Sequence, residues 1–349
     1  MRSDEPLGHD EVLSGLWRAA RAGRLAHALC FVGPEGVGKF LCAERLVAGL
    51  MCAGGIGVAC GNCGPCKRLK IDSHPDVFVI DPTVEGLESI SIGHVAPRAD
   101  GPKVTIAQFL SLRPMEGGFR VVLVRESDRM VEEAQNALLK TLEEPGSQTV
   151  LVLETARPDR LLPTIHSRCV RVPFRALSPD LVERILHARG VAPLEARSLA
   201  RMADGAPGLA TTLAERGVIA MRALLEKALE PRASPLELAG ELAEIEADFP
   251  GKTPAAQARA RARVFLDLLA ALLRDGLRIE AGIDPDTLPF GDLAAPLAGT
   301  PEVLIATSLD RILAARQDVD MNLAPDAAVE RALAALDSLR SKAMRGVRC

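Results

Sequence analysis

The stretch AHALCFVGPEGVGK, residues 26–39, decides the fold of this chain. It begins with a short apolar run typical of a buried strand and continues into a glycine-rich segment that fits the pattern G-x-x-x-x-G-K. A helix is predicted directly afterwards, at residues 40–52. In such a loop the backbone N–H groups cradle phosphates and the lysine reaches the terminal ones. The predicted phosphate-binding residues are Gly33, Gly36, Gly38 and Lys39.

The next segments repeat the alternation of apolar strand and helix. Four more runs of strand type lie at residues 77–80, 121–124, 150–154 and 170–174. Helices are predicted at residues 9–25, 104–113 and 132–144, and an irregular loop at 81–102. Apolar strands that alternate with helices imply a parallel sheet covered on both faces, so the first part of the chain is predicted to be an α/β domain.

The composition and the apolar periodicity of the sequence change after Phe174. From Ser178-Pro179 onward it is rich in Ala, Leu, Glu and Arg with helical periodicity, as in the stripe Leu238, Leu242, Ile245 and Phe249. A length of 349 residues also favours two or three domains. The predicted domains are an α/β domain at 1–176, a small helical domain at 177–214 and a larger helical domain at 215–349.

Two positions that normally serve Mg²⁺ are altered. The residue after the loop lysine normally carries a hydroxyl for the metal, and here it is Phe40. The third strand should end in a carboxylate that supports the same metal, but Arg125 stands there, followed by Glu126. We therefore expect a phosphate-loop domain that has lost, or nearly lost, catalysis. Binding of ATP or ADP through Lys39 and the backbone stays open.

Four of the eight cysteines lie within fifteen residues, in the pattern C-x7-C-x2-C-x2-C: Cys52, Cys60, Cys63 and Cys66. Zn²⁺ prefers four tetrahedral ligands, and four thiolates leave no open position for water. The cluster predicts a structural zinc module at about 52–66. An iron–sulfur cluster or free thiols are the alternatives. His74 lies nearby and is expected to be a surface loop residue.

Composition limits the classes of function. Aromatic residues make up 3% of the chain and tyrosine is absent, which disfavours stacking platforms for single-stranded nucleic acid. A net charge of −4 argues against a surface coated in nucleic acid, although a local basic patch stays open. No apolar stretch approaches the ~20 residues of a membrane span, and the N-terminus has no hydrophobic signal core. We therefore expect a cytoplasmic protein.

Several segments together resemble one known family. RLAHALCFVGPEGVGK at 24–39, the four-cysteine segment, SHPD at 73–76, NALLKTLEEP at 136–145 and PTIHSRC at 163–169 occur in this order. They resemble the bacterial DNA polymerase III clamp-loader subunits of the AAA+ superfamily, over about residues 7–176. The C-terminal half resembles the family only in its helical character and at 312–330. The resemblance implies an AAA+ domain with a zinc-binding insert, a helical lid and a C-terminal helical collar.

The resemblance also implies roles for single residues. Phe40 and Arg125 place the chain with the delta-prime branch, whose nucleotide site is often degraded, rather than with the gamma/tau motor branch. By motif match, Arg168 is the arginine finger that reaches a neighbouring subunit's ATP, where a guanidinium would neutralise the transferring phosphoryl group. An ordinary surface arginine is the alternative. Thr155 matches the polar position that senses the terminal phosphate.

Three hypotheses for function follow. The first is a non-hydrolysing stator that assembles with gamma/tau and delta subunits. With them it would help to load the sliding clamp onto primer-template DNA during replication. The second is an active clamp-loader ATPase whose metal is held by unusual ligands such as Glu126. The third is a zinc-dependent nucleic-acid-binding module, which the shortage of aromatic residues and basic runs disfavours.

Overall fold

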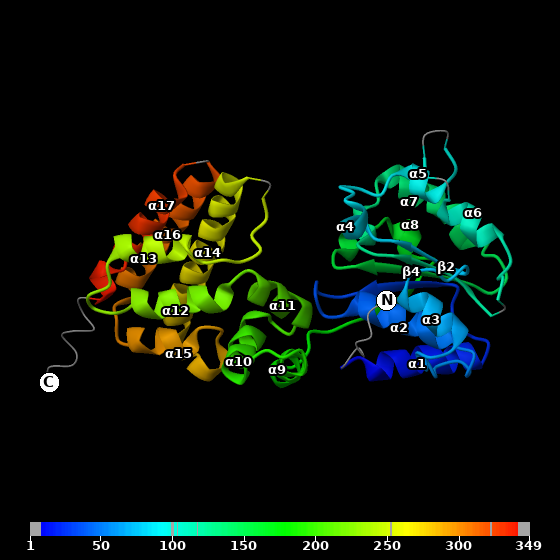
Figure 1. Cartoon of the computed structure of the whole chain (residues 1–349), viewed down its shortest axis with the longest axis horizontal. Helices are drawn as coiled ribbons and strands as arrows, with labels where there is room; N and C mark the ends of the chain where they lie inside the picture. The colour runs from blue at the N-terminus through cyan, green and yellow to red at the C-terminus, as the bar shows by residue number, and fades with distance from the viewer. Residues whose placement is uncertain are drawn as a thin grey trace. The chain divides into compact units, whose positions relative to one another are not determined.

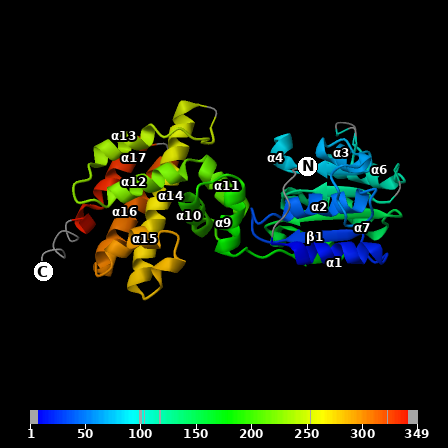
Figure 2. The ribbon, with the colours of Figure 1, turned by 60° about the horizontal axis from the view of Figure 1, so that its bottom comes forward.

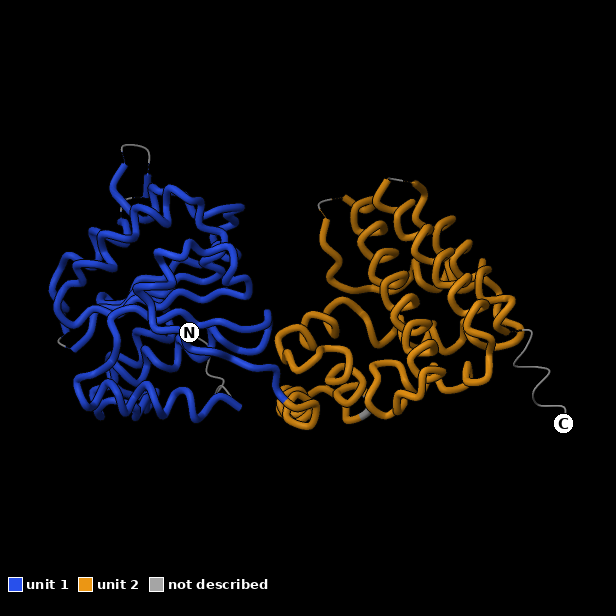
Figure 3. Tube along the Cα trace, turned by 180° about the vertical axis from the view of Figure 1, so that it is seen from behind, with its two compact units in different colours: residues 1–177 blue, residues 178–349 orange. Residues whose placement is uncertain are grey.

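The chain divides into two compact units, residues 1–177 and 178–349, which Figure 3 colours separately. The computed structural model describes residues 8–98, 101–102, 104–116, 118–251, 253–321 and 323–340. Each unit has a hydrophobic core built from its own elements. The first unit is an α/β domain, and the second is made of helices (Figure 1).

A five-stranded sheet forms the centre of the first unit. Its strands are β1 (Ala28–Val32), β2 (Val77–Ile80), β3 (Arg120–Val124), β4 (Thr149–Thr155) and β5 (Val170–Pro173). They are arranged in the order β2-β3-β4-β1-β5, and every pair is parallel. Val32 pairs with Thr155 at the carboxyl end of the sheet. The segments that follow β1, β3 and β4 therefore meet at this edge, where ligands bind in open α/β sheets.

Helices cover both faces of the sheet (Figure 1). On one side lie α1 (Asp10–Arg21), α2 (Lys39–Met51) and α3 (Gly64–Lys70). On the other lie α5 (Ile92–Val95), α6 (Ile106–Ser111), α7 (Glu132–Glu143) and α8 (Pro163–His166). All residues of β1, β3 and β4 are buried, and alternate ones such as Cys30, Val122 and Leu151 share one core with α6 and α7. This two-sided burial explains why the strands are continuously apolar.

The segment 81–102 departs from the prediction of an irregular loop. It contains α4 (Pro82–Glu85) as well as α5, two helices of four residues each. Asp81 caps α4 by accepting hydrogen bonds from the N–H groups of Thr83 and Val84. Short 3₁₀ turns η1 (Ser127–Arg129) and η2 (Pro158–Arg160) follow β3 and β4. Helices this short carry no periodic pattern from which they could be predicted.

The second unit contains helices and short 3₁₀ turns, with no strand among its described residues (Figure 2). Its elements are α9 (Pro179–Ala188), α10 (Pro193–Met202), α11 (Pro207–Glu215), α12 (Val218–Ala228), α13 (Pro235–Ala243), α14 (Pro254–Glu280), η3 (Pro285–Thr287), α15 (Gly291–Ala294), η4 (Ala295–Leu297), α16 (Glu302–Asp320) and α17 (Pro325–Ala334). Ser178, Ser234 and Thr253 each precede a proline and cap a helix by accepting from a backbone N–H three residues on. Serine or threonine at the N-cap with proline in the first turn is a strong helix start.

The helices of this unit form two groups, and the helices within each group contact one another. Helices α9, α10 and α11 form one group, while α14 packs against α16 and α17 in the other. The core of the second group includes Phe265, Leu269 and Ile312. The predicted boundary between a small domain at 177–214 and a larger one at 215–349 stays a prediction. The predicted fold class, a phosphate-loop α/β domain with a parallel sheet followed by helical regions, is confirmed. Among the described residues, no helix has the length and apolar character to cross a membrane.

Candidate phosphate loop and metal centre

The phosphate loop, residues 33–39, connects β1 to α2 at the carboxyl edge of the sheet. Gly36 and Gly38 adopt φ values of 77° and 99°, in the left-handed region that favours glycine. At Gly33 a Cβ atom would lie only 2.3 Å from the carbonyl oxygen of Phe174. The three glycines are therefore required by the backbone geometry of the loop itself.

The loop lysine turns inward. Lys39 is only 3% exposed, and its Nζ donates hydrogen bonds to the carbonyl oxygens of Gly33, at 2.9 Å, and Pro34, at 2.7 Å. The same Nζ lies 3.0 Å from Oε1 of Glu154 on β4. The other oxygen, Oε2 of Glu154, accepts from the backbone N–H of Glu126 at 3.1 Å. The lysine charge is thus neutralised inside the domain by a buried carboxylate.

The two altered magnesium positions contact each other. The Arg125 guanidinium lies 5.2 Å from the ring centroid of Phe40, within the range of a cation–π interaction. It also donates to Oδ2 of Asp81 at 2.9 Å. Burial is the largest influence and lowers the pKa of Arg125, but the hydrogen bond and charge of Asp81, together with the charges of Glu154 and Glu126, outweigh it and raise that pKa. A fixed positive charge therefore stands beside the phenyl ring that replaces the hydroxyl ligand.

The Glu126 carboxylate has partners of its own. It adopts a left-handed φ of 47°, and its Oε1 accepts from the Thr83 hydroxyl at 2.8 Å. Its Oε2 lies 2.7 Å from Nε of Arg129. Both carboxylate oxygens thus have partners away from Lys39. This arrangement gives no support to a metal held by Glu126.

Thr155 ends β4 at the same edge and is fully buried. Its hydroxyl donates to Oδ1 of Asp128 at 2.8 Å and accepts from the backbone N–H of Arg157 at 2.9 Å. The Arg157 side chain also pairs with Asp128. The hydroxyl of the predicted phosphate sensor is therefore engaged in a local network.

Arg168 lies in a separate cluster, just after α8. Its guanidinium donates to the carbonyl oxygen of Thr164 at 3.2 Å and to the Ser167 hydroxyl at 3.1 Å. Its Nη2 lies 2.6 Å from Oε1 of Glu143, the last residue of α7. Both charged side chains are partly exposed, so Arg168 is held at the surface by a neighbour on another helix.

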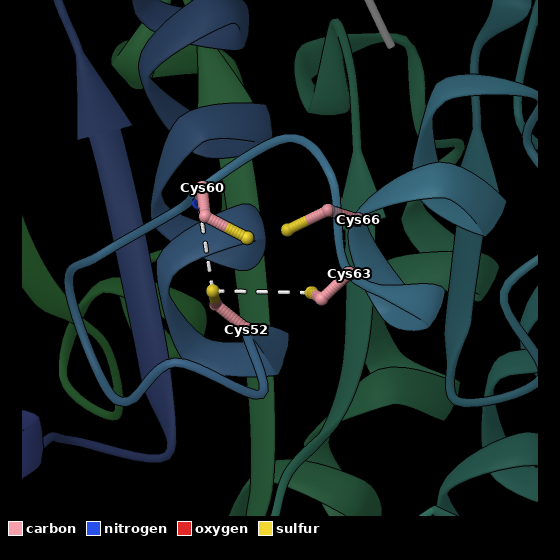
Figure 4. Close-up of side chains that lie close together, drawn as sticks. All are labelled: Cys52, Cys60, Cys63 and Cys66. Carbon is pink, nitrogen blue, oxygen red and sulfur yellow. Dashed lines mark hydrogen bonds between the residues drawn. The ribbon is translucent and has the colours of Figure 1, made fainter.

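The four predicted metal ligands converge. The sulfur atoms of Cys52, Cys60, Cys63 and Cys66 all lie within 4.8 Å of one another (Figure 4). Four thiolates around one zinc at ~2.3 Å are separated by about 3.8 Å, so the arrangement fits a single tetrahedral ion. Cys52 ends α2 and Cys66 lies in α3, while the other two ligands come from the loop between these helices. The sequence-predicted cluster can therefore hold a metal.

The cysteine insert, residues 52–66, is anchored on α1. A Cβ at Gly49 would lie 2.3 Å from Nε1 of Trp17, and a Cβ at Gly57 would lie 3.3 Å from the same indole. Nε of Arg21 donates to the carbonyl oxygen of Ile56 at 2.9 Å. Glycine is thus needed where the indole packs between α2 and the insert.

Local hydrogen bonds favour thiolates in part of the cluster. Backbone hydrogen bonds from Asn62 and Cys63 lower the pKa of Cys60 to about 6. Backbone hydrogen bonds from Cys66 and Ala53 likewise lower the pKa of Cys63. Burial, by contrast, raises the pKa of Cys66 to about 12. A bound cation would supply the charge that stabilises this buried thiolate.

The expectation that His74 lies at the surface is wrong. It is buried, and its Nδ1 accepts from the backbone N–H of Asp76 at 3.2 Å. Asp76 is itself completely buried and pairs with Arg120 at 3.0 Å. Its two oxygens also accept from the N–H groups of Met115 and Glu116. The SHPD segment thus fixes the start of β2 against β3, a role that a local pattern did not reveal.

Two functional candidates were missed by the sequence. Glu154 stands inside the apolar run VLVLET, where a charged residue between buried ones is the available signal. Gln135 on α7 is also buried. It donates to the carbonyl oxygens of Met130 and Arg160 and accepts from the N–H of Leu162, which ties α7 to both 3₁₀ turns. A single glutamine in an amphipathic helix gives no such signal.

Comparisons with known proteins point to one family. Residues 8–178 match the family described as "DNA polymerase III, delta subunit". The DNA polymerase III subunit delta' of Bacillus subtilis is 34% identical over 193 residues, and that of Pseudomonas aeruginosa is 39% identical over 206 residues. These alignments cover 55% and 57% of this chain and 55% and 58% of the relatives, so the chain spans little more than half the length of the relatives it matches.

Two further likenesses accompany these. The DNA polymerase III subunit tau of Escherichia coli is 32% identical over 219 residues, which cover 61% of this chain and 32% of that relative. Among solved structures, a DNA polymerase III gamma subunit-related protein from Thermotoga maritima is 20% identical. That alignment covers 95% of this chain and 99% of the other, with a TM-score of 0.46.

Proposed function

We propose that this chain is a delta-prime-type subunit of the bacterial clamp loader, because residues 8–178 match the family described as "DNA polymerase III, delta subunit" and are similar to curated delta' subunits. In this role it helps to load the sliding clamp onto primer-template DNA during replication. Its partners are the gamma/tau and delta subunits, and it meets clamp and DNA through the complex. The proposed location is the cytoplasm, where this replication takes place.

The chain is proposed not to hydrolyse ATP itself. One observation carries this point: Arg125 packs against Phe40, and these two residues stand at the positions that normally serve Mg²⁺ in a phosphate-loop enzyme. A guanidinium there repels a divalent cation, and a phenyl ring offers no oxygen ligand. The engaged Glu126 gives no support to the alternative of an active gamma/tau-type ATPase.

Arg168 is proposed to act as an arginine finger on the ATP of a neighbouring subunit. Its partly exposed guanidinium is held by Glu143, Ser167 and a carbonyl oxygen, which supports a defined orientation at the surface. The planar guanidinium of an arginine from a neighbouring subunit can neutralise charge on the transferring phosphoryl group. This role needs no nucleotide on the chain that supplies it.

Zinc is proposed as the resident ion of the cysteine cluster. Four cysteine sulfur atoms close enough to bind one ion tetrahedrally favour Zn²⁺, and they leave no ligand position for water. The ion therefore has a structural role, in which it joins the end of α2 to α3. ATP is not proposed as a cofactor, because this chain is proposed not to hydrolyse it.

The decisive experiment is a reconstituted complex of this chain with its gamma/tau and delta partners, in which only this chain is changed. Arg168→Ala should leave assembly intact and reduce DNA-stimulated ATP hydrolysis and clamp loading. The loss at the completed site can reach ~10³-fold. Arg168→Lys should rescue poorly, since an ammonium cannot reproduce the planar fork.

The matched control is Arg171→Ala, which removes another exposed arginine three residues on. It should hydrolyse ATP and load clamps as the wild type does. Wild-type rates for Arg168→Ala in an intact complex would contradict the finger. The isolated chain should hydrolyse no ATP above background, and a turnover of ~1 s⁻¹ would instead identify a motor subunit.

A further inference from the structure

The loop lysine raises a question that the assembly role does not answer. Lys39 is the residue that would bind phosphate, yet it is buried and already neutralised within the domain. We propose that Glu154 acts as an internal anion in place of a nucleotide phosphate, and so keeps this phosphate loop closed to nucleotide. The inference goes beyond the proposed function, because it concerns the ligand of this loop and not the complex.

The first step of the argument is that Lys39 has no free donor. An ammonium group carries three N–H donors. Their acceptors are the carbonyl oxygens of Gly33 and Pro34 and Oε1 of Glu154, at 2.7–3.0 Å. A phosphate oxygen could gain a hydrogen bond from this lysine only by displacing one of them.

The second step is that Glu154 is held in place independently of the lysine. Its Oε2 accepts from the N–H of Glu126, and its own carbonyl oxygen accepts from the Ser127 hydroxyl. The residue lies in β4, paired with Phe31 of β1, and is 8% exposed. The carboxylate therefore has an anchor of its own on β4 and at the Glu126 N–H, besides Lys39.

The third step concerns charge. A phosphate on the far side of the ammonium would lie about 6 Å from this fixed carboxylate, a distance at which like charges in a partly buried site repel strongly. The Mg²⁺ that normally screens phosphate charge is also opposed, because the Arg125 guanidinium lies against Phe40, the residue that stands where a hydroxyl ligand is normal. If the lysine left Glu154 for the ligand, the buried carboxylate would lose its ion pair with the ammonium group, which is costly.

The test is nucleotide binding by the full chain, measured by calorimetric titration with ADP in EDTA and again with Mg²⁺. Glu154→Gln keeps the size of the side chain and an oxygen that can accept from Glu126, but removes the charge. We expect this variant to bind ADP at least about tenfold more tightly than the wild type, the scale expected when one nearby like charge is removed. Equal affinities of the two proteins would overturn the inference.

Two controls make the result specific. Glu133→Gln removes one negative charge from an exposed position of α7 and should leave ADP affinity as in the wild type. Lys39→Ala combined with Glu154→Gln should lose the gained affinity, because the released lysine is what binds the ligand. A gain that survives without Lys39, or that Glu133→Gln reproduces, would contradict the inference.

A stability readout covers the case in which Glu154→Gln folds poorly. Removing the carboxylate leaves the buried Lys39 without a counter-charge, so the variant should melt earlier and ADP or pyrophosphate should restore its melting temperature. The wild type should show no such shift. A destabilised variant that neither ligand restores would overturn the inference. The binding and melting measurements use the chain alone and need neither assembly with other subunits nor ATP hydrolysis. Their outcome therefore tests the role of Glu154 independently of the proposed function.

Discussion

Buried charges organise the first unit at the level of single residues. Asp76 pairs with Arg120 beside β2, while Lys39 pairs with Glu154 beside the phosphate loop. A buried charge is tolerated only with a partner and further hydrogen bonds, and both pairs have them. Each pair joins segments that are far apart in the sequence. Positions that look like binding residues in the sequence can therefore be committed to the fold.

His9 supplies a pH dependence for the first unit. Its ring is buried against Phe174, and its Nε2 lies 2.8 Å from the carbonyl oxygen of Val37. Desolvation lowers its pKa from 6.5, against the smaller opposing effects of the Val37 hydrogen bond and the charge of Asp10. The unfolded chain then binds the proton more readily, so stability should be full above the unfolded pKa and fall as pH drops below about 6.5.

The measurement is chemical unfolding of the first unit at pH 7.5 and pH 5.5. His9→Gln should show a smaller loss of stability between the two pH values than the wild type. A remaining slope is expected, because desolvation also lowers the pKa of the buried His74. His94→Gln, which changes a partly exposed histidine of α5, should keep the full wild-type slope. An unchanged slope in His9→Gln would refute this assignment.

What the sequence predicts at this scale depends on how local the signal is. The loop glycines and the four cysteines follow short spacings, and the structure brings each set together. The partners of Lys39 and Asp76 come from other strands, so no spacing along the chain indicates them. The expectation for His74 was wrong for the same reason, since its Nε2 lies 3.6 Å from Oε2 of Glu116, a residue distant in the sequence.

At the scale of elements, periodicity predicted the sheet well. The apolar run at 77–80 is β2, and the run at 150–154 lies within β4. The predicted helix at 104–113 is shorter, because Thr105 caps α6 and the helix ends at Ser111. The short helices α4 and α5 were missed, since they depend on local caps and not on a repeated apolar face.

The cysteine insert should depend on its metal. Four thiolates at this spacing are expected to bind one zinc per chain, and structural zinc contributes folding free energy directly. Cys63→Ser should lower the metal content and the stability of the first unit. Cys169→Ser, outside the cluster, should keep the metal content of the wild type.

Metal analysis of protein purified under reducing conditions provides the check. A ratio near one zinc per chain is expected for the wild type. Iron with its visible absorption bands would indicate an iron–sulfur cluster instead. Fully reduced protein that holds no metal would show that the four thiols are free.

At the scale of the whole molecule, each unit has its own means of stabilisation. The first combines a parallel sheet with the cysteine insert, and the second is built around α14 and α16. In the second unit Arg340 is buried and donates to the carbonyl oxygens of Ala228, Ala233 and Leu333. This side chain ties the segment after α17 to the end of α12.

We expect two separable unfolding transitions, because the cores are built from different residues. A zinc chelator should lower only the transition of the first unit. Arg340→Ala should lower only the second, by about 2 kcal/mol or more, since it leaves buried carbonyl oxygens without donors. Arg331→Ala, at an exposed ion pair on α17, should change little. Differential scanning calorimetry on the full chain separates these outcomes, and a single transition that both changes shift together would contradict them.

The packing of Trp17 has a spectroscopic consequence. The chain contains one tryptophan and no tyrosine, so its ultraviolet-excited emission comes from a single indole. That ring lies against Gly49 and against Gly57 of the cysteine insert, and its Nε1 donates to the carbonyl oxygen of Leu46. Loosening the insert would admit water to the ring and shift its emission to longer wavelength. The single indole is thus an intrinsic fluorescent probe of whether the proposed metal is bound, readable without a label.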